Sequence, residues 1–174
     1  NVFIGRCWAH LNNTPFRMYK HYNHEGGTAT PLIAHWPAAI KPRTGAAGWM
    51  RTPAHLVDIM ATCVDVGGAT YPDTFHGKPI QPMEGRSLRP LLTDESEFAD
   101  RPLFWEHEGN AAIRAGNRKL VRKGGRGQWE LFDMKHDRTE QNDLAANYPD
   151  EVKALAKQWR EWAQRRNVLP KPKK

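Results

Sequence analysis

A glycine pair, Gly26-Gly27, followed closely by the apolar run Pro31 to Trp36, constrains this 174-residue chain more than any other feature. Two adjacent glycines give the backbone the freedom that a sharp turn requires. A short apolar run ended by Pro37 is typical of a strand buried on both faces, as in a parallel sheet covered by helices. Because one strand cannot form a sheet, we expect its neighbours to lie in sequence outside this chain or in another chain.

A helix is predicted after this strand. Thr52-Pro53 provides an N-cap and a favoured first helical residue, apolar residues recur at helical spacing up to Val64, and Gly67-Gly68 is a stop signal. Strand, loop and helix together predict an α/β layer. Cys63 falls within the apolar spacing and is expected to be buried. Two cysteines make no disulfide framework, and the sequence leaves open a bridge between Cys7 and Cys63.

The second half of the chain changes character after the acidic patch Asp94 to Glu97, which is expected to be a linker. Strand-like runs flank Gly116-Asn117, a hairpin signal, and predict a small antiparallel sheet. Apolar residues from Val152 to Trp162 recur at three- and four-residue steps and predict an amphipathic helix packed on that sheet. We therefore predict two domains: residues 1–97, an incomplete α/β domain, and residues 98–174, a C-terminal α+β subdomain.

Composition limits the partners that this chain can have. There are 26 basic and 19 acidic residues, a net charge of +7, so the surface can attract small anions or nucleic acid. The basic residues are not gathered on one predicted helix with interleaved aromatic residues, so we do not expect nucleic acid to be the partner. No apolar run approaches the ~20 residues of a membrane span, and no membrane partner is expected.

Lys20 is the candidate for chemistry, because an ammonium group is a good partner for a tetrahedral oxyanion and this one stands among aromatic residues just before the glycine pair. The histidines in this part of the chain fit no closed zinc pattern, so no metal ligand is predicted there; they are His10, His21, His24 and His35. His35, inside the apolar run, is expected to be a hydrogen-bonded core residue. The polar stretch from Glu106 to Asn110 is either a rim loop or a strand end followed by a turn.

Five groups of motifs follow one another along the chain: Asn13 to Arg17 with Lys20, His24 to Gly27 and Thr30 to Pro37; His55 to Met60 with Tyr71-Pro72; Glu84 to Leu88; Leu103 to Asn110 with Arg118 to Val121; and Trp129 to Asp133 with Asp137 to Glu140 and Asn142 to Ala145. In this order they resemble one family, the sulfatases of the arylsulfatase type. The resemblance covers nearly the whole chain and places it in the C-terminal portion of such an enzyme, which makes residues 1–97 the expected C-terminal end of the catalytic α/β domain.

The resemblance implies an alkaline-phosphatase-like α/β core, a sulfate ester substrate (an aryl sulfate or a sulfated saccharide) and a periplasmic or secreted location. In the family, a cysteine or serine in a Cys/Ser-x-Pro-x-Arg motif becomes the formylglycine nucleophile, and calcium (Ca2+) clamps the sulfate. Lys20 matches the family lysine five residues before Glu-Gly-Gly, which would contact a sulfate oxygen. His21, His24 and Asn110 are further candidates to line the pocket.

This chain departs from the family pattern in what it lacks. Neither Cys7 nor Cys63 stands in the modification motif, and the family's calcium ligands lie upstream of residue 1. The nucleophile and the metal are therefore expected in a missing N-terminal catalytic portion, and the isolated chain is expected to be inactive. Two alternatives stay open: a phosphonate or phosphate ester hydrolase of the same superfamily, and a basic module that binds sulfated polysaccharide or nucleic acid.

Overall fold

The computed structural model describes residues 5–43, 45–93 and 100–169. The chain forms two compact units, and each is described by itself. Unit 1 combines Asn1–Pro31 with Asp100–Lys174, and unit 2 is Leu32–Ala99. These units differ from the expected division at residue 97, because the first 31 residues pack with the C-terminal sheet. The expected linker, Asp94 to Glu97, lies outside the described residues, and the domain division of the parent protein stays a prediction.

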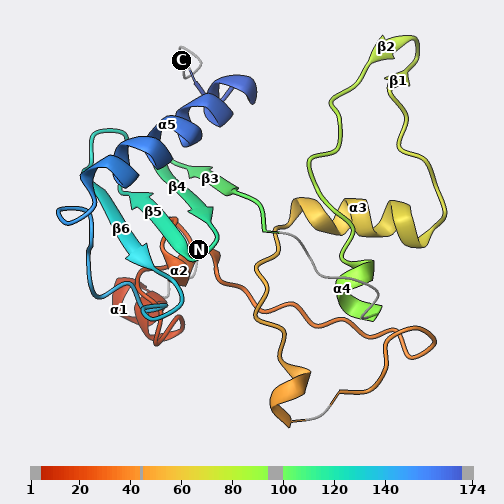
Figure 1. Ribbon diagram of the computed structural model, residues 1–174, viewed down its shortest axis with the longest axis horizontal. Helices are drawn as coiled ribbons and strands as arrows, with labels where there is room; N and C mark the ends of the chain where they lie inside the picture. The colour runs from red at the N-terminus through yellow and green to blue at the C-terminus, as the bar shows by residue number, and fades with distance from the viewer. Residues whose placement is uncertain (1–4, 44, 94–99, 170–174) are drawn as a thin grey trace. The chain divides into compact units, whose positions relative to one another are not determined.

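Unit 1 is built on a four-stranded antiparallel sheet (Figure 1). Its strands are β3 (Leu103–His107), β4 (Asn110–Ala115), β5 (Arg118–Arg122) and β6 (Trp129–Asp133), which pair in chain order. The hairpin expected at Gly116-Asn117 is confirmed, with Ala115 opposite Arg118 and Gly116 at a φ of 56°. Such a positive φ suits glycine, which explains the tight connection.

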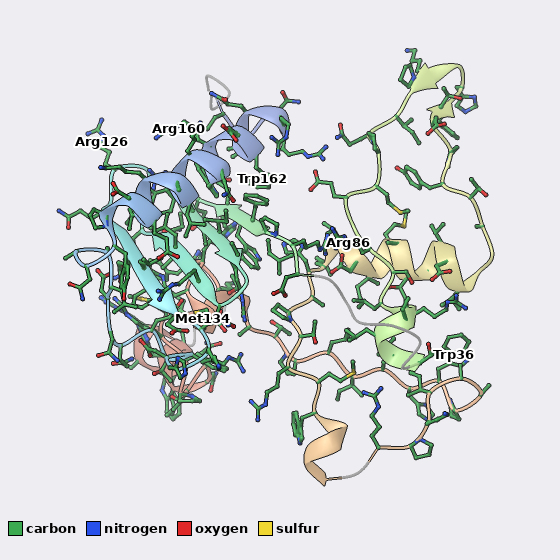
Figure 2. The ribbon with its side chains drawn as sticks, in the orientation of Figure 1. Trp36, Arg86, Arg126, Met134, Arg160 and Trp162 are labelled. Atoms are coloured by element: carbon green, nitrogen blue, oxygen red, sulfur yellow. The ribbon has the colours of Figure 1, made fainter. Side chains whose placement is uncertain are left out.

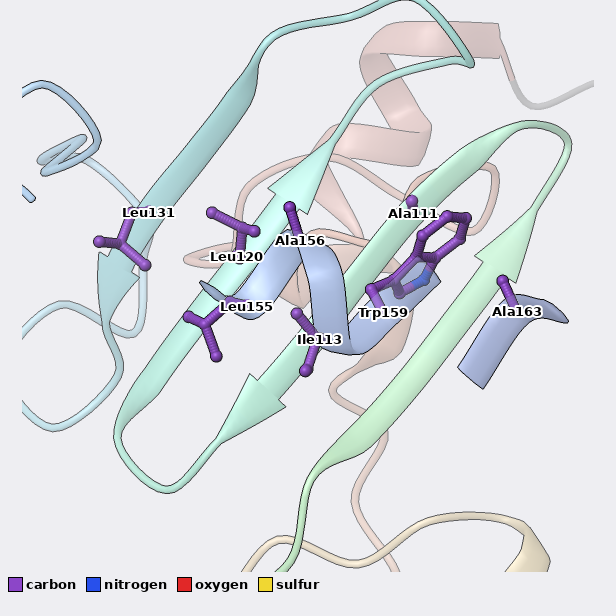
Figure 3. Close-up of a cluster of buried hydrophobic side chains, with 8 residues drawn as sticks. All are labelled: Ala111, Ile113, Leu120, Leu131, Leu155, Ala156, Trp159 and Ala163. Carbon is purple, nitrogen blue, oxygen red and sulfur yellow. The ribbon is translucent and has the colours of Figure 1, made fainter. Parts of the chain in front are cut away.

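One face of this sheet is apolar and is covered by helix α5 (Pro149–Arg165), as the spacing predicts. The cross-strand row of Ile113, Leu120 and Leu131 is fully buried (Figure 3). Trp159 of α5 packs into the same cluster, and its indole nitrogen donates to the carbonyl of Trp105 at 3.0 Å. Trp162, labelled in Figure 2, is also on α5, and its ring stacks on that of Phe104 with the centroids 5.1 Å apart. Burial of these rings supplies much of the core energy.

The opposite face of the sheet carries the alternate residues and is partly ionic. Ala112, Val121 and Phe132 form a small buried apolar cluster there, while Lys119 and Glu130 face the same side. The N-terminal segment packs against this face through helix α2 (Glu25–Thr28) and the residues before it. A further helix, α1 (Gly5–Leu11), precedes them. The sheet thus lies between the apolar face of α5 and an N-terminal segment held by ion pairs.

Unit 2 is less regular. It contains the 3₁₀ turn η1 (Gly45–Gly48), helix α3 (Val57–Val66), the strand pair β1 (Thr74–Phe75) and β2 (Lys78–Pro79), and helix α4 (Arg89–Thr93). Gly67 ends α3 as predicted, and the Ser87 hydroxyl accepts a hydrogen bond from the Arg89 amide at the start of α4.

Three expectations for unit 2 are wrong. The run Pro31 to Trp36 forms no strand, and Ile33 is 90% exposed, because no strand among the described residues pairs with it. His35 is exposed for the same reason and is not a core residue. Helix α3 begins at Val57 and not at Thr52-Pro53.

The cysteines also differ from expectation. Cys63 is exposed, although its apolar spacing favoured burial, since α3 turns Asp58 and Ala61 inward. The Asp58 carboxylate is fully buried and accepts hydrogen bonds from the amides of His55 and Arg86. Cys7 and Cys63 are both free thiols. None of the helices in the described part of the chain has the length and apolar character of a membrane span.

Candidate functional site

Lys20 lies on a tight turn in unit 1 and is exposed. The amide of Tyr22 donates to the carbonyl of Tyr19 at 2.8 Å, which closes the turn around Lys20 and His21. The rings of Tyr19 and Tyr22 meet edge to face, with centroids 5.3 Å apart. The aromatic neighbours therefore pack together below the turn, and the ammonium group is presented outward.

The glycine pair supports this turn for a reason that differs from the predicted one. Neither Gly26 nor Gly27 has a positive φ. A Cβ atom on Gly26 would collide with the carbonyl oxygen of Met18, and one on Gly27 with that of Tyr22. Backbone oxygens cannot move aside as a flexible side chain can. The glycines are therefore required for close approach of the chain to α2, and not for an unusual backbone conformation.

A buried ion cluster fixes α2 to the sheet. The ammonium group of Lys119 is fully buried and lies 2.8 Å from Glu25 Oε1 and 3.0 Å from Glu140 Oε1. The backbone amide of Glu25 donates to Glu140 Oε2, and Arg138 donates to Glu25 Oε2. Burial raises the pKa of Glu25, but Lys119 above all and then Arg138 outweigh it and hold that pKa below its ordinary value.

A second ion group lies beside the first. The Arg17 guanidinium donates to Glu130 Oε2 at 2.7 Å and to the carbonyl of Glu140 at 3.1 Å. His24 is fully buried, with Nε2 3.6 Å from Glu130 Oε1, a close contact that is too long for a strong hydrogen bond. His24 first, and then Arg17, lower the pKa of Glu130 to about 2. These contacts hold the segment before α2 on β6.

Three exposed side chains meet next to the Lys20 turn. His21 Nδ1 lies 2.8 Å from Glu108 Oε2, although these residues are 87 positions apart in the sequence. His107 Nε2 lies 3.8 Å from Glu108 Oε1, and the two imidazole rings stack with a centroid distance of 6.2 Å. The hydrogen bond with His21, followed by the charges of His21, His107 and Lys20, lowers the pKa of Glu108. We call His21, His107 and Glu108 the imidazole cluster.

Asn110 joins the two parts of this cluster. Its side-chain amide donates to the carbonyls of His21, at 2.7 Å, and His107, at 2.8 Å, and its Oδ1 accepts from the Gly124 amide at 3.0 Å. The residue is 7% exposed. Its amide hydrogens and its carbonyl oxygen are used internally, so Asn110 sets the position of the Lys20 turn against the β3–β4 hairpin.

The predicted site residues thus separate into two groups. Lys20 and His21 are exposed on one turn, and Asn110 lies behind them. His24 lies apart, inside the ion group of Glu130, where its placement supports a structural role. A substrate contact for any of these residues stays a proposal.

Sequence reasoning did not select His107 and Glu108. They were recognised only as part of a polar stretch that is either a rim loop or a strand end, and the structure shows a strand end followed by a turn: β3 ends at His107, and Glu108 has a φ of 53°. In the sequence, the only indication of a site here is that two polar residues, His107 and Glu108, stand where a hairpin turn is expected. Their partner His21 could not be found, because only the tertiary fold brings the two segments together.

The donor atoms present here do not fit calcium. Within the described ranges, one group of three or more His, Cys, Asp or Glu side chains lies close enough to share an ion, and it is the imidazole cluster. Calcium prefers six to eight oxygen ligands, whereas this cluster offers two imidazoles and one carboxylate. The sequence also holds no Cys/Ser-x-Pro-x-Arg motif for formylglycine around Cys7 or Cys63.

The antiparallel sheet packed by a C-terminal helix agrees with the expectation from the resemblance to sulfatases. A family model described as "N-sulphoglucosamine sulphohydrolase, C-terminal" matches residues 16–166. The chain belongs to this sulfatase family.

Relatives agree with this assignment. An uncharacterised sulfatase of Schizosaccharomyces pombe is 27% identical over 98% of this chain and 31% of its own length. A sulfatase of Formosa agariphila is 27% identical over 84% of this chain and 28% of its own length. The crystal structure of Ps i-CgsB with k-i-k-neocarrahexaose has a TM-score of 0.70 at 23% identity, covering 87% of this chain and 32% of that one, and shows the shared fold. The chain therefore spans about a third of the length of these relatives.

Proposed function

We propose that the parent protein is a sulfuric ester hydrolase of the arylsulfatase type, and that this chain contributes Lys20 to the binding of the substrate's sulfate group. The observation that carries this proposal is that Lys20, in the stretch that resembles the family, is exposed on a turn that Asn110 hydrogen-bonds to the β3–β4 hairpin. Such a position suits a group that must meet a substrate held largely by the rest of the enzyme.

The chemistry assigned to Lys20 is electrostatic. Its ammonium group would donate a hydrogen bond to a sulfate oxygen, where negative charge grows in the transition state, and losing one such donor typically costs on the order of a hundredfold in rate. The fixed turn reduces the reorganisation that this contact requires. The formylglycine nucleophile and the calcium ion belong, in this proposal, to parts of the parent enzyme outside this chain.

A saccharide ester is the substrate class that we test first. The family description names a sulphoglucosamine, and a solved protein of the same fold binds a neocarrahexaose. The exposed imidazoles of His21 and His107 and the Lys20 ammonium group are hydrogen-bond donors that suit the oxygens of such a ring. An aryl sulfate is the comparison substrate, because its small leaving group needs no such contacts.

The experiment measures kcat/KM of the full parent enzyme on a sulfated saccharide and on an aryl sulfate. Lys20→Ala should lower it about a hundredfold on both substrates, without changing the unfolding midpoint. Lys153→Ala, which removes another exposed lysine in helix α5, should leave it unchanged. If the Lys20→Ala enzyme kept the kcat/KM of the wild-type enzyme on both substrates, the proposed role of Lys20 in sulfate binding would be refuted.

Two outcomes would replace the proposed reaction itself. A parent enzyme that cleaves phosphonate or phosphate esters faster than sulfate esters would be the related hydrolase. A parent without esterase activity that binds heparin or DNA, with affinity falling steeply as salt rises, would be a binding module. The 174-residue chain alone should show no sulfate ester turnover, and turnover by this chain would contradict the assignment of the nucleophile to another region.

A further inference from the structure

We propose that the imidazole cluster of His21, His107 and Glu108 is a binding site for a divalent transition-metal ion, with Zn²⁺ as the ion that its ligands fit best. The prediction from the sequence was that this chain has no metal ligands, because one segment alone supplies no zinc pattern. The fold changes this by joining two segments. The proposal concerns binding alone and does not depend on sulfatase activity.

The donor types select the class of ion. Two imidazole nitrogens and one carboxylate oxygen are a common ligand set for Zn²⁺ and its neighbours in the first transition row, whereas calcium and magnesium prefer oxygen. The three ligand atoms lie within 4.8 Å of one another. Three protein ligands leave a fourth position of a tetrahedral ion for water.

The separations are close to those that coordination requires. Zinc bonds of about 2.0–2.2 Å at tetrahedral angles place neighbouring ligand atoms roughly 3.4 Å apart. His21 Nδ1 lies 2.8 Å from Glu108 Oε2, and His107 Nε2 lies 3.8 Å from the other oxygen, Glu108 Oε1. The side chains are 47%, 54% and 56% exposed for His21, His107 and Glu108, so they can rotate to bring the three ligand atoms around one ion without disturbing the core.

The backbone beneath the cluster is already fixed. Asn110, which is nearly buried, bonds the carbonyls of both histidines, and the Gly109 amide donates to Glu106 Oε1 at 2.8 Å within the same hairpin. The cost of bringing the two segments together is therefore met by folding and not by metal binding.

The positive charge of Lys20 opposes the binding of a metal cation, because Lys20 interacts electrostatically with the ligand Glu108. An exposed cation beside a metal site lowers its affinity but is screened by water and salt. Removing that charge with Lys20→Met should therefore raise zinc affinity a few-fold, which is the opposite of the effect expected on ester hydrolysis. The two roles are separable by this one substitution.

The test titrates the untagged 174-residue chain with Zn²⁺ by calorimetry and with Co²⁺ by visible absorption at pH 7.5. We expect one ion per chain and a tetrahedral Co²⁺ spectrum. His21→Ala, His107→Ala and Glu108→Gln should each weaken binding by at least about tenfold. Circular dichroism should be unchanged, because all three side chains are exposed.

The matched control is His136, an exposed histidine that pairs with Asp133 at 2.9 Å and belongs to no group of three possible ligands in the part of the chain that the structure describes. His136→Ala should leave zinc binding unchanged. Binding that survives in a His21→Ala/His107→Ala double variant, or that disappears in His136→Ala, would overturn the proposal. So would the absence of a saturable site in the wild-type chain.

Discussion

Replacing Glu130 by glutamine tests the ion group that holds the lysine turn on the sheet. The carboxylate contacts Arg17 at 2.7 Å and His24 at 3.6 Å, and its side chain is 19% exposed. Glutamine keeps the size of the side chain and one acceptor oxygen but removes the charge. The variant therefore isolates the electrostatic part of the anchor.

The magnitude follows from the pKa of Glu130, which falls from 4.5 to about 2 on folding. Since one pKa unit corresponds to about 1.4 kcal/mol, the charged form stabilises the native state by about 3.5 kcal/mol at most. Residual exposure to water reduces this, and we expect Glu130→Gln to lower the free energy of unfolding by about 2–3 kcal/mol at pH 7.

The sign of the pH dependence is fixed by the direction of the shift. A carboxyl group whose pKa is lower in the folded state stabilises that state fully above the unfolded pKa. Its contribution is lost as the pH falls from 4.5 toward 2, because protonation then favours the unfolded chain. The difference in unfolding free energy between wild type and Glu130→Gln should therefore be constant from pH 7 to 5 and shrink below pH 4.5.

The assay is urea unfolding followed by tryptophan fluorescence at pH values from 7 to 3. Glu151→Gln is the control, because it removes a partly exposed ion pair with Arg118 and should cost less than about 1 kcal/mol. A Glu130→Gln variant as stable as wild type at pH 7, or a difference that persists unchanged to pH 3, would refute the reasoning.

Three other substitutions probe the remaining supports of unit 1. Lys119→Met leaves the buried carboxylate of Glu25 without its nearest cation and should destabilise the chain by about 3–5 kcal/mol in urea. Gly27→Ala drives a Cβ atom against the carbonyl of Tyr22 and should lower the melting temperature, whereas Gly125→Ala, in open space, should not. Trp159→Ala empties the centre of the apolar core and should cost about 3–5 kcal/mol by calorimetric unfolding, and a loss below 1 kcal/mol would contradict its burial.

The C-terminal sheet could be predicted because its signals are local. The hairpin depends on Gly116-Asn117, and helix α5 on an apolar repeat that is complete within the helix itself. Each of these elements finds its packing partner within the same unit. Local propensity and tertiary environment therefore favour the same structure, and for this reason the structure of this region can be predicted from its sequence.

The strand expected at Pro31 to Trp36 failed for the converse reason. Its apolar character indicates burial, but a strand also needs hydrogen-bonding neighbours, and the described residues provide none. The exposed Ile33 and Leu56 show that apolar composition alone does not define a core. The apolar pattern of a segment indicates which of its side chains can be buried. It does not indicate whether another element is present to pack against them.

The site was predictable only in part, because residue types were visible and their pairings were not. Lys20 and His21 stood out beside the glycine pair, and their exposure agrees with a contact role. His24 carried the same apparent signal and is buried instead against Glu130, more than a hundred positions away. A histidine's neighbours along the chain cannot reveal such a partner, since the contact arises where the segment before α2 packs on β6.

The buried charges of unit 1 also help to select the correct pairing of strand β5 with its neighbours. Residues on β5 alternate between the apolar face, with Leu120, and the ionic face, with Lys119. A slip of one residue in strand pairing would move Lys119 into the apolar layer beneath α5 and expose Leu120 to the carboxylates. The same ions that anchor the lysine turn therefore penalise the wrong pairing, so that the position of Lys20 depends on the correct register of a strand ninety-nine residues further along the chain.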